Sequence, residues 1–533
     1  MNDKKVSDKK VNDKKVSDKK PSDKKLNLKY VVCLPIALVL FAFLWFFPIE
    51  PVTVGNLKFG YSLFFGEGVL SQVEVRVIAL FALAAMFWIF EIIPTWCTST
   101  MIIVLMLLTV SDQAAFTFAS DSNVGDLISY KSILATFAEP TVMLFLGGFA
   151  LALCATKVGL DAQLARVLMA PFGTNPKMVL LGFLIVIGLF SMFMSNTATA
   201  AMMLAFLAPV LRSLPDEGSK IGLALAIPIA ANIGGIGTPI GTPPNTIALK
   251  YLNEPSFIEG INTKLAAAND ALGTAFEPIA RIGFPEWCAV MVPFALIMLI
   301  ISWVMLLIVF PFKVDKIELK IESKPVKDKS YWIVVVTFIV TVFLWMTEKL
   351  HGLNSYVVAM IPVGVFAATG VLGKKEIKSL DWDVLWMVAG GFALGLGLNK
   401  TGLASHLVQA IPFGEWMPIL VLIVASLLAY ALSNFISHSA ASALLIPILA
   451  AVATGMAGTP GFENMGGATT LLVTVAVTCS LAMLFPISTP PNAIAHSTGL
   501  IKTRDMAVTG AIIGGIGIAL LYAIMIFIGL PKF

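Results

Sequence analysis

Long apolar segments separated by short polar ones run along most of this chain after residue 28. About 20 apolar residues in a helix span a hydrocarbon core of roughly 30 Å, so each segment predicts at least one membrane-crossing helix. The apolar segments cover approximately residues 29–48, 72–94, 97–110, 137–157, 176–212, 219–250, 284–312, 331–350, 354–372, 382–399, 415–451, 468–500 and 507–531. The pattern predicts an all-α polytopic membrane protein with about eleven transmembrane helices plus two re-entrant helical hairpins.

The two predicted hairpins are the segments 176–212 and 415–451. Each is too long for a single crossing and carries a polar break near its middle. We interpret each as two half-helices that enter and leave the membrane on the same side.

An internal repeat relates the two halves of the chain. Four blocks recur in the same order: GGFALALCATKVGL from Gly147 and GGFALGLGLNKTGL from Gly390, SNTATAAMMLAFLAP from Ser195 and SNFISHSAASALLIP from Ser433, Thr-Pro-Pro-Asn at Thr242 and Thr489, and Trp-x-x-Glu at Trp88 and Trp345. Each copy contains an odd number of predicted full crossings, so the second copy would be inverted in the bilayer relative to the first. Inverted-topology repeats with broken helices are typical of secondary transporters.

Five regions follow from these patterns. They are a Lys/Asp-rich tail (1–28), a lone first helix and loop (29–70), a first inverted repeat (71–312) with its inner hairpin, a basic linker (313–330) and a second inverted repeat (331–533) with its outer hairpin. The tail repeats a five-residue unit and has no large apolar residue before Leu26, so it is predicted to be disordered.

Composition and charge support a membrane location. Hydrophobic residues make up 58% of the 533 residues and charged residues only 13%, whereas a soluble domain carries about 25% charge. The net charge of +4 comes from lysines beside the predicted membrane segments, which indicates topology rather than nucleic-acid binding. The positions of these lysines predict a cytoplasmic N-terminus. A plasma membrane is the default expectation, because no organellar presequence is recognised.

The break in each hairpin carries polar residues suited to an anion. These are Ser195, Asn196 and Thr197 in the first hairpin, and Ser433 and Asn434 in the second. The start of a half-helix offers free backbone N–H groups and the positive end of a helix dipole. Two such tips would suit a substrate with two carboxylates. The alternative is that each Ser-Asn pair merely caps a helix.

The Thr-Pro-Pro-Asn motifs predict interrupted helices. Glycine and proline unwind a helix, and carbonyl groups exposed at bilayer depth require a cavity or a protein interior. Such carbonyls could bind a hard cation, and the hydroxyls of Thr242 and Thr489 could reach the anion. The alternative is a pair of prolines that only kink a packing helix.

These paired motifs resemble the divalent anion:sodium symporter family, also called the INDY family, over nearly the whole chain after about residue 30. The resemblance implies di- or tricarboxylate substrates, a homodimer and an elevator-like movement of a transport domain. It also implies a sodium site at Ser191, Ser195, Asn196 and the backbone around Gly241.

A second sodium site would use the positions of Ala429, Asn434 and Ser488, where the match to the family's cotransporters weakens. Two histidines, His438 and His496, lie near this second motif, and similar histidines occur in the exchanger branch of the family. A positive charge on either could stand in for a missing cation. The alternative for each is a neutral side chain in a helix interface.

The leading prediction is therefore a dicarboxylate exchanger for substrates of the 2-oxoglutarate, malate and succinate class. Sodium-coupled symport by the same fold is the second prediction, and an anion channel is the alternative from a different class. An enzyme is not expected, because the sequence shows no HExxH, GxSxG or Walker motif near the hairpins. No cofactor is expected apart from Na⁺.

Overall fold

The computed structural model describes residues 29–54, 57–66, 69–119, 124–317, 327–410 and 416–529. The predicted tail and the middle of the basic linker lie outside the described residues, as does the start of the second hairpin.

The described chain is helical except for one short strand pair. Up to the linker, the elements are η1 (Lys29–Cys33), α1 (Leu34–Phe46), β1 (Val52–Val54), β2 (Leu57–Phe59), α2 (Ser62–Phe65), α3 (Gln72–Ile89), α4 (Thr95–Thr109), α5 (Phe116–Ala119), α6 (Tyr130–Ala135), η2 (Thr136–Ala138), α7 (Pro140–Lys157), α8 (Leu160–Met169), η3 (Ala170–Phe172), α9 (Pro176–Ser191), α10 (Asn196–Ser213), α11 (Glu217–Ile236), α12 (Pro243–Leu252), α13 (Pro255–Leu272) and α14 (Phe284–Val309). Strands β1 and β2 pair antiparallel, with Val52 opposite Phe59.

The second half of the chain continues with helices alone among its described residues. They are α15 (Lys329–Met346), α16 (Glu348–His351), α17 (Ser355–Ala368), α18 (Lys374–Lys378), α19 (Trp382–Lys400), α20 (Leu403–Ala410), α21 (Pro418–Phe435), α22 (His438–Met456), α23 (Pro460–Glu463), α24 (Gly467–Leu481), α25 (Pro490–His496) and α26 (Thr503–Phe527).

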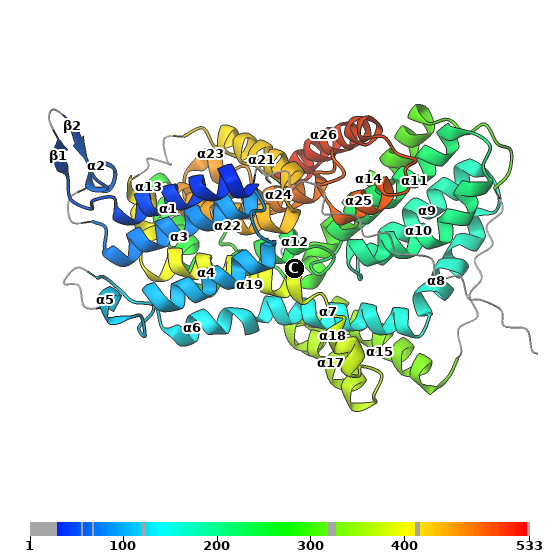
Figure 1. Cartoon of the computed structure of the whole chain (residues 1–533), viewed down its shortest axis with the longest axis horizontal. Coiled ribbons are helices and arrows are strands. Elements are labelled where there is room, and N and C mark those ends of the chain that lie inside the picture. Colours follow the sequence, from blue (N-terminus) through cyan, green and yellow to red (C-terminus); the bar gives the residue numbers. More distant parts are fainter. Residues whose placement is uncertain are drawn as a thin grey trace, which may run out of the picture.

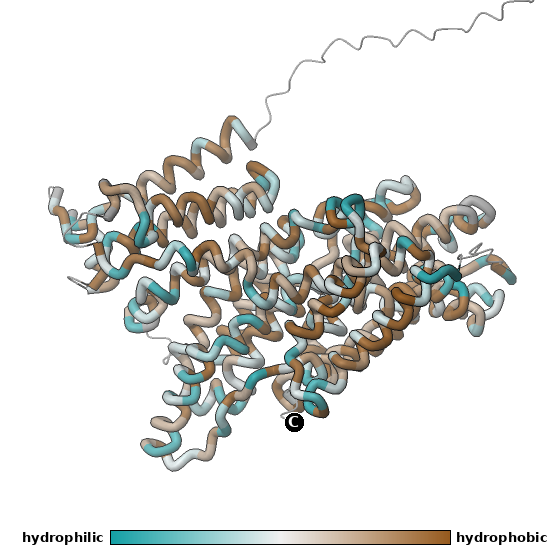
Figure 2. The backbone as a smooth tube through the Cα atoms, turned by 90° about the horizontal axis from the view of Figure 1, so that it is seen from below, coloured by the Kyte–Doolittle hydropathy of each residue, from teal (hydrophilic) through white to brown (hydrophobic). Residues whose placement is uncertain are grey.

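Eight helical stretches within the described residues are long and apolar enough to cross a membrane. They are Gln72–Ile89, Tyr130–Lys157, Glu217–Ile236, Phe284–Val309, Lys329–Met346, Pro418–Phe435, His438–Met456 and Thr503–Phe527. Six shorter apolar helices accompany them. Figure 2 shows hydrophobic colour along most helices, with hydrophilic colour concentrated in the connecting segments and short helices. The chain is therefore a multi-pass membrane protein, as the apolar pattern predicted.

Corresponding helices of the two halves make corresponding contacts. Helix α7 of the first half packs on α17 of the second, while α19 of the second half packs on α4 of the first. Both contacts are close at a glycine: a Cβ on Gly147 would overlap the Ala359 carbonyl, and one on Gly390 would overlap Ser99. In Figure 1, α7 and α19 lie between the α1–α4 end and the α8–α11 end of the molecule.

The repeated Trp-x-x-Glu blocks also adopt matching local structure. The fully buried indoles of Trp88 and Trp345 donate hydrogen bonds to the carbonyls of Thr95 at 3.2 Å and Ser355 at 3.0 Å, the first residues of α4 and α17. The similarity supports the internal repeat, whereas the inversion of the two copies across a bilayer stays a prediction.

Candidate functional site

The turn between α9 and α10 places the first Ser-Asn-Thr motif at the start of a helix. Ser195 is the N-cap of α10, and its Oγ accepts a hydrogen bond from the Ala198 N–H at 3.2 Å. Serine is favoured here because its short side chain satisfies a backbone N–H that has no partner within the helix. Asn196 and Thr197 therefore occupy the first turn of α10, at the positive end of its dipole.

The second turn lies four residues later than the sequence comparison predicted. Helix α21 continues through Phe435, and Ser437 is the N-cap of α22, with its Oγ accepting from the Ala440 N–H at 3.2 Å. Ser433 and Asn434 consequently lie in the last turn of α21 rather than at the tip. The predicted register of the second motif is corrected by one helical turn.

This shift has an identifiable cause in the sequence. Ser433-Asn434 repeats two letters of the first motif at the same distance from a downstream proline, but several serines in this segment are able to cap a helix. The structure instead aligns Ser-His-Ser-Ala from Ser437 with Ser-Asn-Thr-Ala from Ser195. Both tetrapeptides have a hydroxyl residue at the first and third positions and an alanine at the fourth. This shared pattern could have indicated the right register between the two motifs. It places His438 at the position of Asn196.

Both Thr-Pro-Pro-Asn motifs start a helix after an interrupted segment. Thr242 and Thr489 are the N-caps of α12 and α25, and the prolines follow in the first turn, where a missing N–H costs no intrahelical bond. Residues 237–242 and 482–489 connect these helices to α11 and α24.

The asparagine of each motif holds the interrupted segment in place. Asn245 Nδ2 donates to the carbonyls of Gly235 at 3.0 Å, Ile236 at 3.3 Å and Thr238 at 2.8 Å. Its counterpart is bound in a similar way, since Asn492 Nδ2 donates to the carbonyls of Met483 at 3.0 Å and Phe485 at 2.9 Å. The two asparagines are thus fully buried positioning residues, a role that sequence reasoning did not assign.

Oxygen atoms converge on Asn196 beside the first turn. The buried Ser191 Oγ lies 2.6 Å from Asn196 Oδ1 and 2.7 Å from the Ala231 carbonyl oxygen. With its amide turned the other way, Asn196 would donate through its nitrogen to Ser191 Oγ, to the Ala231 carbonyl at 3.1 Å and to the Gly241 carbonyl at 3.2 Å. Hydroxyl, amide and carbonyl oxygens grouped in this way are ligands suited to a hard cation.

Three of the four predicted cation-site positions, Ser191, Asn196 and Gly241, are therefore brought together, and the Ala231 carbonyl is an addition that the sequence did not indicate. The fourth, Ser195, caps α10 instead. Close approach explains the glycines in this region, because a Cβ on Gly235 would lie 2.6 Å from Asn196 Oδ1 and one on Gly241 would overlap the Gly235 carbonyl.

The corresponding second region contains an imidazole. His438 Nε2 lies 2.6 Å from the Ala482 carbonyl oxygen and must carry the hydrogen, because a carbonyl only accepts. Asn434 Oδ1 accepts from the Leu484 N–H at 2.7 Å and from Ser488 Oγ at 3.2 Å. With the corrected register, Ser433 rather than Ala429 stands four residues before the N-cap serine, as Ser191 does in the first region.

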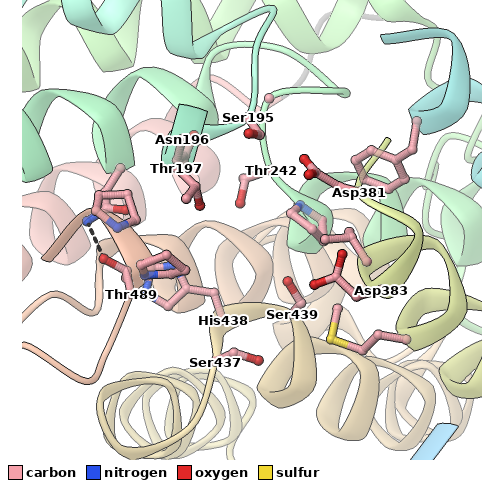
Figure 3. Close-up of a pocket in the computed structure, with 18 of the residues that line it drawn as sticks. Ser195, Asn196, Thr197, Thr242, Asp381, Asp383, Ser437, His438, Ser439 and Thr489 are labelled. Carbon is pink, nitrogen blue, oxygen red and sulfur yellow. Dashed lines mark hydrogen bonds between the residues drawn. The ribbon is translucent and has the colours of Figure 1, made fainter. Parts of the chain in front are cut away.

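A cavity of about 340 Å³ lies between the two turns (Figure 3). The turns and the two interrupted segments supply most of its polar lining: Ser195, Asn196, Thr197, Gly241, Thr242, Ser437, His438, Ser439, Ser488 and Thr489. The N-termini of α10 and α22 thus open into one space, together with those of α12 and α25.

Some of the predicted site residues lie outside this lining. Other residues line the cavity but were not predicted from the sequence. Ser433, Asn434 and His496 are outside the lining. Asn232, Asp381 and Asp383 belong to it. The two aspartates lie within ten residues before the repeated glycine block at Gly390, and their nearness to a motif was the available signal.

Known proteins resemble this chain over most of its length. Residues 85–465 match the family described as citrate transporters. A relative from Staphylococcus saprophyticus, named sodium-dependent dicarboxylate transporter SdcS, is 27% identical over 90% of this chain and 91% of its own length.

Two further relatives also match most of this chain. An uncharacterized transporter from Haemophilus influenzae is 30% identical over 72% of this chain and 80% of its own length. A protein from Caenorhabditis elegans named sodium-dependent high-affinity dicarboxylate transporter 3 is 26% identical over 80% and 78%. The family match covers most of the chain, including both serine-capped turns and the first interrupted segment. The chain therefore belongs to the citrate transporter family, and it is a membrane transporter rather than an enzyme.

Proposed function

We propose that this protein is a secondary active transporter that moves dicarboxylate anions together with sodium. The observation that carries the proposal is the Ser191 hydroxyl and the Ala231 and Gly241 carbonyl oxygens, which gather around the Asn196 amide beside an anion-compatible cavity. The names of the relatives from Staphylococcus saprophyticus and Caenorhabditis elegans support both the substrate class and the coupling ion.

The cavity suits a substrate with two carboxylates. The N-termini of α10 and α22 approach it with capping serines, so each can present N–H and hydroxyl donors to one carboxylate. Thr242 and Thr489 add a hydroxyl from each interrupted segment. Its volume of about 340 Å³ is adequate for small dicarboxylates of the succinate, malate and 2-oxoglutarate class.

A cation at the first oxygen group would offset the charge of the anion. Asn196 contributes to this group and also lines the cavity, so it connects the two positions. Coupling requires that each ligand favours binding of the other, and a positive charge held next to a dianion has that effect.

Dicarboxylate exchange without sodium is the second candidate, and one observation favours it. His438 stands where the first turn has Asn196, so a protonated imidazole in the second region could take the place of a bound cation. The corrected register weakens the case against a second sodium site, because Ser433 supplies the hydroxyl that Ala429 lacks.

We also propose the architecture that accompanies this function. Two inverted repeats would carry the turns in re-entrant hairpins, and a homodimer would move each cavity across the membrane by an elevator-like motion. The family resemblance supports the dimer and the motion, and the matching contacts α7–α17 and α4–α19 support the repeat. The lysine-rich segments support a cytoplasmic N-terminus, and the bacterial relatives support a plasma membrane.

Uptake of radiolabelled succinate by proteoliposomes tests the function and separates the two modes. One set of vesicles is empty and the other contains unlabelled succinate, each with an inward sodium gradient or with potassium in its place. Accumulation in empty vesicles that requires sodium supports symport. Uptake that requires internal succinate and ignores sodium identifies an exchanger, and no uptake in any condition would contradict dicarboxylate transport.

A further inference from the structure

A buried amide of the first half of the chain contacts the cavity-lining threonine of the second half. Asn232 lies on α11, which packs against α25, and it is 1% exposed. Its Nδ2 donates hydrogen bonds to Thr489 Oγ1 and to Asn492 Oδ1, each at 3.2 Å. Asn232 and Thr489 both line the cavity in which the anion is proposed to bind.

The orientation of the Asn232 amide is fixed by its neighbours. Asn492 Nδ2 donates to the carbonyls of Met483 and Phe485, so Asn492 presents its oxygen to Asn232. An amide oxygen only accepts hydrogen bonds, so Asn232 must present its nitrogen. The other amide atom, Asn232 Oδ1, has no hydrogen-bond partner among the described residues. The fold therefore leaves one side of this buried amide unsatisfied while its nitrogen holds Thr489 and Asn492.

The contacts of Thr489 determine where its hydroxyl hydrogen can go. Thr489 Oγ1 accepts hydrogen bonds from Asn232 Nδ2 and from the Asn492 N–H, each at 3.2 Å. A hydroxyl oxygen has two lone pairs and one hydrogen, so these two donors occupy its capacity to accept. Within the described part of the chain these are the hydrogen bonds of the Thr489 side chain. Its hydrogen is therefore available to a ligand in the cavity.

The first half of the chain has a different arrangement at the corresponding threonine. Thr242 also begins a helix and lines the cavity, but its side chain makes no capping hydrogen bond. Asn232 lies ten residues before Thr242, and the residue ten positions before Thr489 is Cys479. The buried Cys479 thiol interacts with the Ser433 hydroxyl. Among the described residues, Thr489 is thus the motif threonine whose hydroxyl is held by a buried amide.

We propose that Asn232 is a positioning residue for the anion site, which directs the hydroxyl hydrogen of Thr489 toward one carboxylate of the substrate. Asn232 occupies a lone pair of the hydroxyl and so disfavours its rotation. Carboxylate oxygens only accept hydrogen bonds, so a hydroxyl held as a donor binds them and one that presents a lone pair does not. The inference rests on the proposed dicarboxylate transport and makes the two ends of the cavity unequal.

A double-mutant cycle on succinate uptake tests whether Asn232 acts through Thr489. Proteoliposomes are used under the conditions in which the wild type is active. Thr489→Val removes the hydroxyl at nearly constant shape, and the half-saturating succinate concentration should rise at least about tenfold. Asn232→Leu should raise this concentration at least about fivefold and keep the maximal rate within about twofold, because the amide acts on substrate binding. In the Thr489→Val background, Asn232→Leu should change it by less than about twofold, since no hydroxyl remains to be directed.

Two further variants complete the test. Asn464→Leu, at an exposed position after α23, is the matched control and should keep the wild-type values. Asn232→Cys introduces the residue that the second half has at this position, and it replaces Asn232→Leu in the cycle if gel filtration shows that the leucine variant is not folded. The same fivefold rise is expected for it.

Three results would overturn the proposal. They are a further fivefold rise in the double variant, which would make Asn232 independent of Thr489, an unchanged half-saturating concentration in the Asn232 variant, and a loss of its maximal rate alone. Absence of uptake by the wild type would instead contradict the proposed function.

Discussion

Asn196 and His438 stand at equivalent positions in the two turns, yet their side chains differ in what they offer a cation. The Asn196 amide can turn either an oxygen or a nitrogen toward Ser191 and two carbonyl oxygens. The His438 ring places an N–H against the Ala482 carbonyl, which occupies that carbonyl with a donor. One amide and one imidazole therefore make the two halves of the site chemically unequal, although their helices begin alike.

This inequality predicts the effect of restoring the amide. His438→Asn should add a second sodium site, so that the Hill coefficient for sodium in succinate uptake rises from about 1 toward about 2. The matched variant His496→Asn, outside the cavity, should leave the coefficient unchanged. A coefficient that stays the same in His438→Asn would show that the histidine does not determine the number of sodium ions.

The first oxygen group predicts a complementary loss. Asn196→Ala removes the amide between Ser191 and the Gly241 carbonyl, and the half-saturating sodium concentration should rise at least about tenfold, equivalent to about 1.4 kcal/mol. Asn464→Ala, at an exposed position after α23, is the control for loss of an asparagine. Sodium titration of succinate uptake measures both. An unchanged sodium requirement in Asn196→Ala would place the cation elsewhere.

The buried Asn245 should matter mainly for stability. Removing its amide takes a donor from three buried carbonyls, of which Ile236 keeps the Trp287 indole N–H and Thr238 keeps the Gly241 N–H. The loss should cost about 1–3 kcal/mol of stability and lower the thermal unfolding temperature in detergent. Asn464→Ala serves again as the comparison. Equal unfolding temperatures for the two variants would mean that water or backbone movement replaces these bonds.

At the scale of elements, glycine determines how closely α7 and α17 approach. A Cβ on Gly147 would overlap the Ala359 carbonyl, whereas one on the adjacent Gly148 would be in ordinary contact, 3.5 Å from Ile240 Cδ1. Gly147→Ala should therefore destabilise the protein by about 1–3 kcal/mol, and Gly148→Ala should be nearly neutral. Thermal unfolding of the two purified variants checks this pair, and equal stability would contradict the close helix contact.

Some element boundaries could be predicted from the sequence and others could not. The interrupted helices before Thr242 and Thr489 could be predicted because two prolines and several glycines act locally. The end of α21 could not, since Ser433 and Ser437 are both capable N-caps and the choice depends on how α21 packs against α24. For a similar reason Asn232 was missed, because only the tertiary fold brings it to the cavity.

At the scale of the whole molecule, the two halves meet at a polar cavity. Helices α10 and α12 from the first half and α22 and α25 from the second begin there, while α19 contributes the aspartate pair. The apolar pattern and the repeated blocks predicted a multi-pass membrane transporter, and the structure and the relatives confirm that description. The movement of the cavity across the membrane stays a prediction.

The most direct test of sodium-coupled dicarboxylate transport is to measure both fluxes at once. Purified protein in empty proteoliposomes is given radiolabelled sodium and succinate, with the membrane potential held at zero. The account predicts that succinate stimulates sodium entry, that sodium stimulates succinate entry, and that Asn196→Ala weakens both effects. Succinate entry with no accompanying sodium flux would contradict it.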